Sequence, residues 1–211
     1  MSYESDYFIM IITGELSNHP SVSFIQDLID AIKKVDSNYF SWKLYKGEDT
    51  KDAYCERVFA YELYHQLRCI MNPYNTVENI ERYQGLTLNG ETIKDNSFFN
   101  NLFSNLEQQR FIPDLVLHKD LGKVEEEGQI YLAEIKMSEN VKALDDLAKL
   151  TMLSKSSLNF SCYIFIIVGK NKDELKQELG KIETENLSKD IVCICTKYGD
   201  ASAHYLKEII S

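Results

Sequence analysis

Two short apolar segments that carry charged residues constrain the fold of this chain more than any other feature. The first, FIPDLVLH (Phe111–His118), contains Asp114, and the second, QIYLAEIKM (Gln129–Met137), contains Glu134 and Lys136. Alternate residues of a β-strand point to the same face of its sheet, so Glu134 and Lys136 should project together. Charged side chains are rarely buried unless they are paired or bind an ion. Both segments therefore predict buried strands that contribute to a charged site.

The order of the elements around these strands predicts their pairing. CYIFIIVG (Cys162–Gly169) is apolar throughout, as expected of a central strand that is covered on both faces. A helix predicted over Glu139–Lys155 lies between this strand and Gln129–Met137, which favours parallel pairing through a right-handed crossover. Phe111–His118 can pair antiparallel with Gln129–Met137 across a linker rich in Gly and Glu, Lys119–Gly128. The pattern predicts an α/β fold with a mixed central sheet flanked by helices.

Hydrophobic periodicity and turn residues predict the remaining elements. They are a strand at Tyr7–Thr13, a helix from Ser21 or Ser23 to Val35, a polar stretch at Lys46–Asp52, a helix at Ala53–Met71, a hairpin at Tyr83–Ile93 with its turn at Asn89–Gly90, helices at Ser97–Gln109, Lys172–Ile182 and Ala201–Ile210, and a strand at Ile191–Thr196. A chain of 211 residues suits one domain better than two. We expect residues 1–50 to form a strand and helix extension that packs on a core of residues 51–211.

Composition bears on location and on partners. The five cysteines include no CxxC pair, which indicates reduced thiols and a cytoplasmic protein. The longest apolar run near the N-terminus, Tyr7–Ile12, is too short to span a membrane, so no membrane association is expected. The net charge of −10 argues against tight unaided binding to DNA, because phosphate contacts usually require a basic surface.

The residues of the two charged segments are similar in type and order to a known nuclease motif. Pro113-Asp114 is followed twenty residues later by Glu134-Ile135-Lys136, which resembles the PD-(D/E)XK nuclease superfamily. CERVFAYELYHQLR, from residues 55 to 68, also resembles the helix that precedes the motif in bacterial proteins of this class. The resemblance covers about residues 56–169 and implies a restriction-endonuclease-like fold. It implies a metal-dependent nuclease, with DNA favoured over RNA as the substrate.

The resemblance also implies a role for each residue of the motif. Asp114 and Glu134 would bind Mg²⁺, or Mn²⁺ in its place, together with the backbone carbonyl of Ile135. Mg²⁺ prefers oxygen ligands and keeps several waters, so one or two carboxylates suffice. The cation would lower the pKa of its bound water and act as a Lewis acid. Lys136 would orient the attacking water or stabilise the pentacovalent phosphate.

Many members of this family add a glutamate from an earlier helix to the catalytic and metal-binding set. Glu62 is our first choice, because it lies within the apolar stripe of its helix, and Glu56 is the second. Lys149, on the helix after the motif, is a weaker candidate for a phosphate contact. A structural alternative for Glu62 is an ion pair with Arg57 or Arg68.

Other interpretations stay open at this point. Glu134 and Lys136 could form a solvated ladder on one face of a sheet, and Asp114 could hold an Asx turn. A catalytically silent domain of the same fold, acting as a protein-interaction or nucleic-acid-binding module, is the main alternative function. A metal-dependent hydrolase with another substrate is a third. A homodimer or a protein partner is compatible with each of them.

Overall fold

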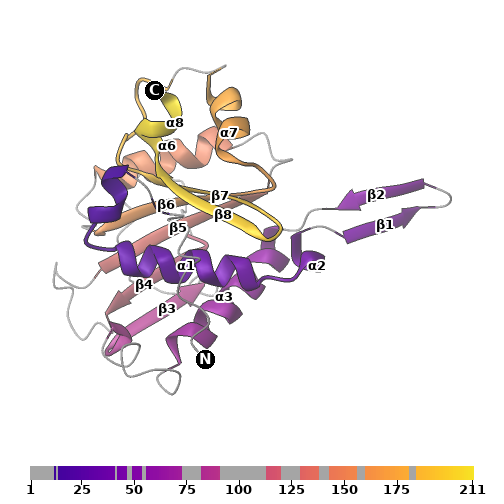
Figure 1. Cartoon of the computed structure of the whole chain (residues 1–211), viewed down its shortest axis with the longest axis horizontal. Helices are drawn as coiled ribbons and strands as arrows, with labels where there is room; N and C mark the ends of the chain where they lie inside the picture. The colour runs from indigo at the N-terminus through magenta and orange to yellow at the C-terminus, as the bar shows by residue number, and fades with distance from the viewer. Residues whose placement is uncertain are drawn as a thin grey trace, which may run out of the picture.

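A six-stranded mixed sheet forms the centre of the protein, as the computed structural model shows (Figure 1). Strand β5 pairs antiparallel with β4 and parallel with β6, β6 pairs parallel with β7, and both outer pairs are antiparallel. This arrangement confirms the predicted α/β class and the predicted pairing of the two motif strands. In spatial order the strands are β3 (Leu86–Gly90), β4 (Leu115–Lys119), β5 (Gln129–Met137), β6 (Cys162–Val168), β7 (Val192–Lys197) and β8 (Asp200–Tyr205).

The structure describes eleven segments of the chain. They are residue 12 and residues 14–40, 42–46, 49–53, 56–72, 82–90, 113–119, 129–137, 143–155, 160–180 and 184–211, with residues 42–46, 49–53 and 143–144 described by their backbone alone. Several predicted elements lie wholly or mostly outside these residues. They are Tyr7–Thr13 except Ile12, Ser97–Gln109, the linker after Lys119, and the start of the helix predicted at Glu139.

Helices cover both faces of the sheet, which explains why β6 is buried along its whole length. One face packs against α1 (Val22–Lys34) and α3 (Glu56–Met71), and the other packs against α6 (Ala143–Ser154) with α7 (Lys172–Leu179) and α8 (Leu206–Ile210). The side chains of β5 alternate between these two cores, as the period of a strand requires. Tyr131, Ala133, Ile135 and Met137 belong to the core with α1 and α3, whereas Leu132 belongs to the core with α6.

The N-terminal part of the chain packs on the same sheet. A short 3₁₀ helix, η1 (Gly14–Asn18), precedes α1, which packs against α3 and β8. Ile12 forms an isolated parallel bridge with Ala203 of β8. Ser21 stands at the N-cap position of α1, although its side chain makes no capping hydrogen bond.

Two predictions about the elements were wrong. Asn89 and Gly90 lie inside β3, paired with Val116 and Leu115, and do not form a hairpin turn. The segment predicted as one helix at Ala201–Ile210 divides into β8 and α8, and Ala201 to His204 alternate between buried and partly buried positions as in a strand. The polar stretch at Lys46–Asp52, for which no element was predicted, contributes to a separate hairpin of β1 (Trp42–Lys46) and β2 (Asp49–Ala53), after the short helix α2 (Ser37–Phe40).

The helix predicted from Ala53 begins at Glu56, because Ala53 pairs with Trp42 in the β1–β2 hairpin. Its C-terminal end at Met71 agrees with the prediction, and Asn72-Pro73 follows it in the sequence. The difference at the start changes which side chains stand in the first turn of α3. Within the described part of the chain, no helix is long and apolar enough to cross a membrane.

Candidate functional site

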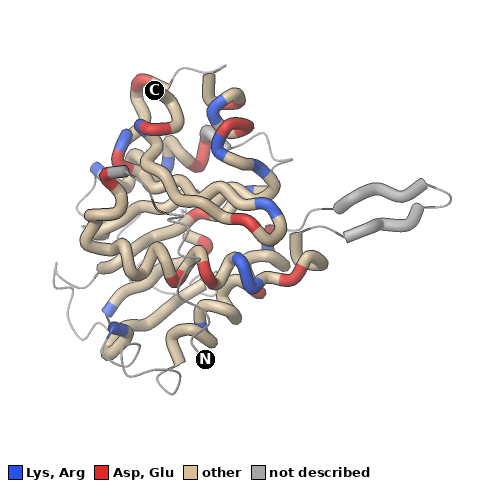
Figure 2. Tube along the Cα trace, in the orientation of Figure 1, with Lys and Arg blue, Asp and Glu red and all other residues tan. Residues whose placement is uncertain are grey.

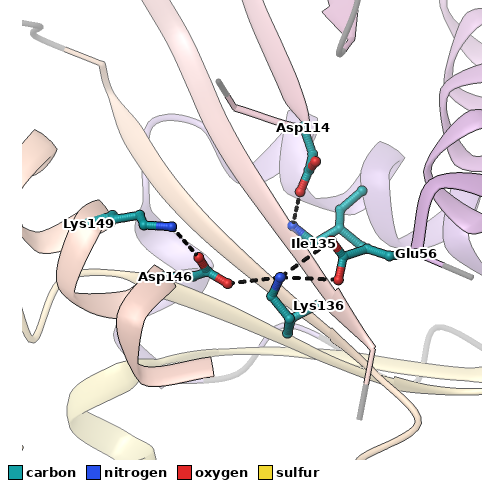
Figure 3. Close-up of polar contacts among 6 residues, drawn as sticks. All are labelled: Glu56, Asp114, Ile135, Lys136, Asp146 and Lys149. Atoms are coloured by element: carbon teal, nitrogen blue, oxygen red, sulfur yellow. Dashed lines mark hydrogen bonds and ion pairs between the residues drawn. The ribbon is translucent and has the colours of Figure 1, made fainter. Parts of the chain in front are cut away.

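The motif residues meet where β5 passes the start of β4. Asp114 immediately precedes β4, and its Oδ2 accepts a hydrogen bond of 2.7 Å from the backbone N–H of Ile135 (Figure 3). The register places Leu115 opposite Ala133, so β5 runs past the first residue of β4 and leaves the Ile135 amide available to this side chain. The structure therefore brings Asp114 to the Glu134-Ile135-Lys136 segment.

Glu134 is buried on the face of the sheet that packs against α6. It is 7% exposed, and among the described residues its Oε1 has no hydrogen-bond partner. Burial raises the pKa of Glu134 well above its ordinary value, and the negative charges of Asp114 and Asp146 raise it further. The ammonium groups of Lys149 and Lys136 act in the opposite direction. The ionised form of this carboxyl is therefore strongly disfavoured unless a further cation approaches it.

Lys136 projects to the same side of β5 and contacts two helices. Its Nζ lies 3.0 Å from Oδ2 of Asp146 on α6 and 3.3 and 3.2 Å from Oε1 and Oε2 of Glu56 on α3. Burial by itself lowers the pKa of Lys136, but the carboxylates of Asp146 and Glu56 raise it overall. The lysine is therefore charged and held between the two helices.

Asp146 was not predicted from the sequence as a site residue. It is 4% exposed, and its Oδ1 accepts a hydrogen bond of 2.9 Å from Nζ of Lys149, while its Oδ2 forms the ion pair with Lys136. Its spacing from Leu150 by four residues puts both on one face of α6, and Leu150 is fully buried. An aspartate at i with a core leucine at i+4 is the sequence signal that could have indicated its burial.

The glutamate that α3 brings to the motif is Glu56, our second choice. Glu62, the first choice, accepts a hydrogen bond of 2.7 Å on its Oε1 from Nε2 of Gln66 on the same helix. Six residues turn an α-helix by about 240°, so Glu56 and Glu62 point in different directions. Among the described contacts, none joins Glu62 to Asp114, Glu134 or Lys136, and its role as a ligand stays a prediction.

The donors present suit a hard divalent cation in their chemistry. One oxygen of Glu134 has no hydrogen-bond partner among the described residues, and the negative charge of Asp114 acts on this carboxyl. Mg²⁺ takes such oxygen ligands while keeping several waters. Within the described segments, however, no three side chains of His, Cys, Asp or Glu come together in a group that could hold a metal ion. A cation here would therefore have at most two protein side chains among these residues as ligands.

Comparison of the chain with protein-family models, with curated proteins and with solved structures found no match.

Proposed function

We propose that this chain is a metal-dependent phosphodiester hydrolase of the PD-(D/E)XK type with a restriction-endonuclease-like fold. The observation that carries the proposal is the buried carboxyl of Glu134, which feels the charge of Asp114 and has one oxygen without a hydrogen-bond partner among the described residues. A buried charge without a partner costs several kilocalories per mole, and strongly perturbed pKa values concentrate at functional sites. A cation bound between these carboxyls would remove that cost.

The topology around the motif supports this proposal. Asp114 stands at the start of an antiparallel strand, and Glu134 and Lys136 stand near the carboxyl end of β5, which is parallel to β6 and β7. In open α/β sheets, ligands commonly bind outside the carboxyl ends of the strands. A helical crossover through α6 connects β5 to β6, as the resemblance to the family implied.

The residues have distinct roles in the proposed reaction. Asp114 and Glu134 would hold Mg²⁺ or Mn²⁺ through their carboxylate oxygens, and the cation would supply Lewis acidity. Lys136 would donate hydrogen bonds to the phosphate or to the attacking water, because its Nζ is charged and it follows Glu134 by two residues on β5. Glu56, which is partly exposed, would hold the ammonium of Lys136 in the absence of substrate.

A catalytically silent module of the same fold is the second candidate, and one observation favours it. The ammonium of Lys136 is already engaged by Glu56 and Asp146, and carboxylates outnumber lysines around it. The chain has a net charge of −10, and in the view of Figure 2 acidic and basic residues are interspersed over the described elements. A silent module would bind neither Mg²⁺ nor Mn²⁺ at this place.

Calorimetry with Mg²⁺ and Mn²⁺ tests the proposal, with cleavage of supercoiled plasmid and of a 5′-labelled single-stranded oligonucleotide measured in parallel. Wild type should bind one of the cations and cleave with it, and Asp114→Ala and Glu134→Ala should do neither. Asp145→Ala is the matched control, because this exposed aspartate lies on the same side of the sheet but outside the site. Wild type that binds no cation would refute the nuclease function and support the silent module.

A further inference from the structure

One carboxylate near the motif, that of Asp146, forms ion pairs with two lysines. Figure 3 shows Asp146 between the ammonium groups of Lys149 and Lys136. Each oxygen of Asp146 has its own lysine, at 2.9 Å for Lys149 and 3.0 Å for Lys136. Lys149 keeps 39% of its side chain exposed, so the group opens to solvent on that side.

Asp146 is the fixed member of the group. Its helix is held on the sheet by Leu147 and Leu150, which are both fully buried in the core with β5 and β6. Glu56, the other partner of Lys136, keeps 30% of its side chain exposed and can move into solvent. A lysine has a long, flexible stem, so a defined position for its Nζ requires an anchor that does not move.

A purely structural role in the helix does not account for the burial of Asp146. Acidic residues in the first turn favour a helix through its dipole, but the exposed neighbour Asp145 provides the same effect. Burying a carboxylate near Glu134 is unfavourable, because removing a charge from water costs several kilocalories per mole. The position of Asp146 is explained by the two ammonium groups that it holds beside Glu134.

We propose that Asp146 is a positioning residue that anchors Lys136 and Lys149, so that both can contact the phosphate groups of a nucleic acid. Lys136 contacts the scissile phosphate and displaces the partly exposed Glu56. Lys149, whose side chain is more exposed, contacts the neighbouring phosphate. Asp146 touches neither the substrate nor the cation. This inference rests on the proposed nuclease function for the identity of the ligand, but the anchoring itself is independent of cleavage.

The anchoring is tested by NMR of the full chain labelled with ¹³C at lysine, without any substrate. Lys136→Arg and Lys149→Arg assign the two signals. Asp146→Asn should move both signals toward those of mobile, exposed lysines, and the control Asp145→Asn should move neither. Unchanged signals in a folded Asp146→Asn protein would overturn the inference. Asp146→Glu keeps the charge but shifts it by one methylene group, and it should also move the Lys136 signal. This variant replaces Asp146→Asn in the test if Asp146→Asn does not fold.

The positioning role is tested by the kinetics of oligonucleotide cleavage with Mn²⁺. Misplacing a catalytic group by about 1 Å can lower a rate about 100-fold, so Asp146→Asn should lower kcat by about this factor. KM and Mn²⁺ binding by calorimetry should change little, and Asp146→Glu should recover part of kcat. Cleavage by Asp146→Asn at the wild-type rate would overturn the proposal. If wild type does not cleave while Asp146→Asn still displaces both lysine signals, the nuclease function fails and the anchoring stands.

Discussion

Replacing Glu134 by glutamine should stabilise the fold at neutral pH while abolishing cation binding. The carboxyl is 7% exposed, and among the described residues its Oε1 has no hydrogen-bond partner. An unsatisfied buried polar group costs about 1–3 kcal/mol, and more when it is charged. Glutamine also buries a polar amide, so the gain comes from removing the ionisation alone, and Glu134→Gln should raise the free energy of unfolding by about 1–3 kcal/mol at pH 8.

The pH dependence of this gain follows from the raised pKa. Near pH 4 and below, the carboxyl is protonated in both the folded and the unfolded chain, so its ionisation contributes no difference between the variants. Above its ordinary pKa of 4.5 the unfolded chain ionises first, while the folded chain keeps its proton. Wild type therefore loses stability as the pH rises toward the raised pKa of Glu134, and the loss is complete above that pKa. Glu134→Gln lacks this loss.

Urea unfolding of both proteins in EDTA at several pH values between 4 and 8 measures the effect. The stability difference between Glu134→Gln and wild type should increase with pH, whereas Asp145→Asn, an exposed control on α6, should show no comparable increase. Saturating Mn²⁺ should stabilise wild type and leave Glu134→Gln unchanged. A stability difference that is zero or independent of pH would refute the assignment of Glu134 as a strained buried carboxyl.

Three further predictions concern the site and the fold. In the proposed site the ionised form of Glu134 is the ligand, so the apparent Mn²⁺ affinity should fall as the pH falls. Calorimetry in buffers of different ionisation enthalpy should detect released protons, and binding without proton release would contradict this. Asn171→Ala removes a capping bond of 2.9 Å to the N–H of Glu174 and should lower stability by about 1 kcal/mol in urea unfolding, whereas an unchanged midpoint would show that the cap contributes nothing. Leu63→Ala empties a fully buried position on α3 and should cost about 2–5 kcal/mol by the same assay, so a cost below that range would mean that the core there relaxes.

The parts of the fold that depend on local pattern could be predicted from the sequence. The charged strand Gln129–Met137 appears as β5 with the predicted bounds, and the apolar run predicted at Cys162–Gly169 appears as β6, which ends one residue earlier at Val168. Their parallel pairing followed from the helix between them and from the handedness of crossovers. These features depend on residues close together in the chain.

Tertiary pairing decided the elements whose local signals were ambiguous. Asn89-Gly90 is a strong turn signal, yet β4 provides it with strand partners, so it continues β3. Ala201 and Ala203 fit either a helix or a strand by composition, and β7 on one side and the α1 core on the other select the strand. In both places, hydrogen bonds with a segment distant in the sequence outweigh the local preference for a turn or a helix.

In the candidate site, too, some features follow from the sequence and others only from the tertiary structure. The sequence predicted that Asp114 lies near Glu134 and Lys136, through the resemblance and the expected antiparallel pairing of the two strands, and the bond from the Ile135 N–H to Asp114 agrees with this. Only the tertiary structure decided that α3 contributes Glu56 to Lys136 and that α6 contributes Asp146. Charged residues on separate helices come into contact only when both helices pack on one sheet. The local sequence pattern of each helix contains no information about the distance between them.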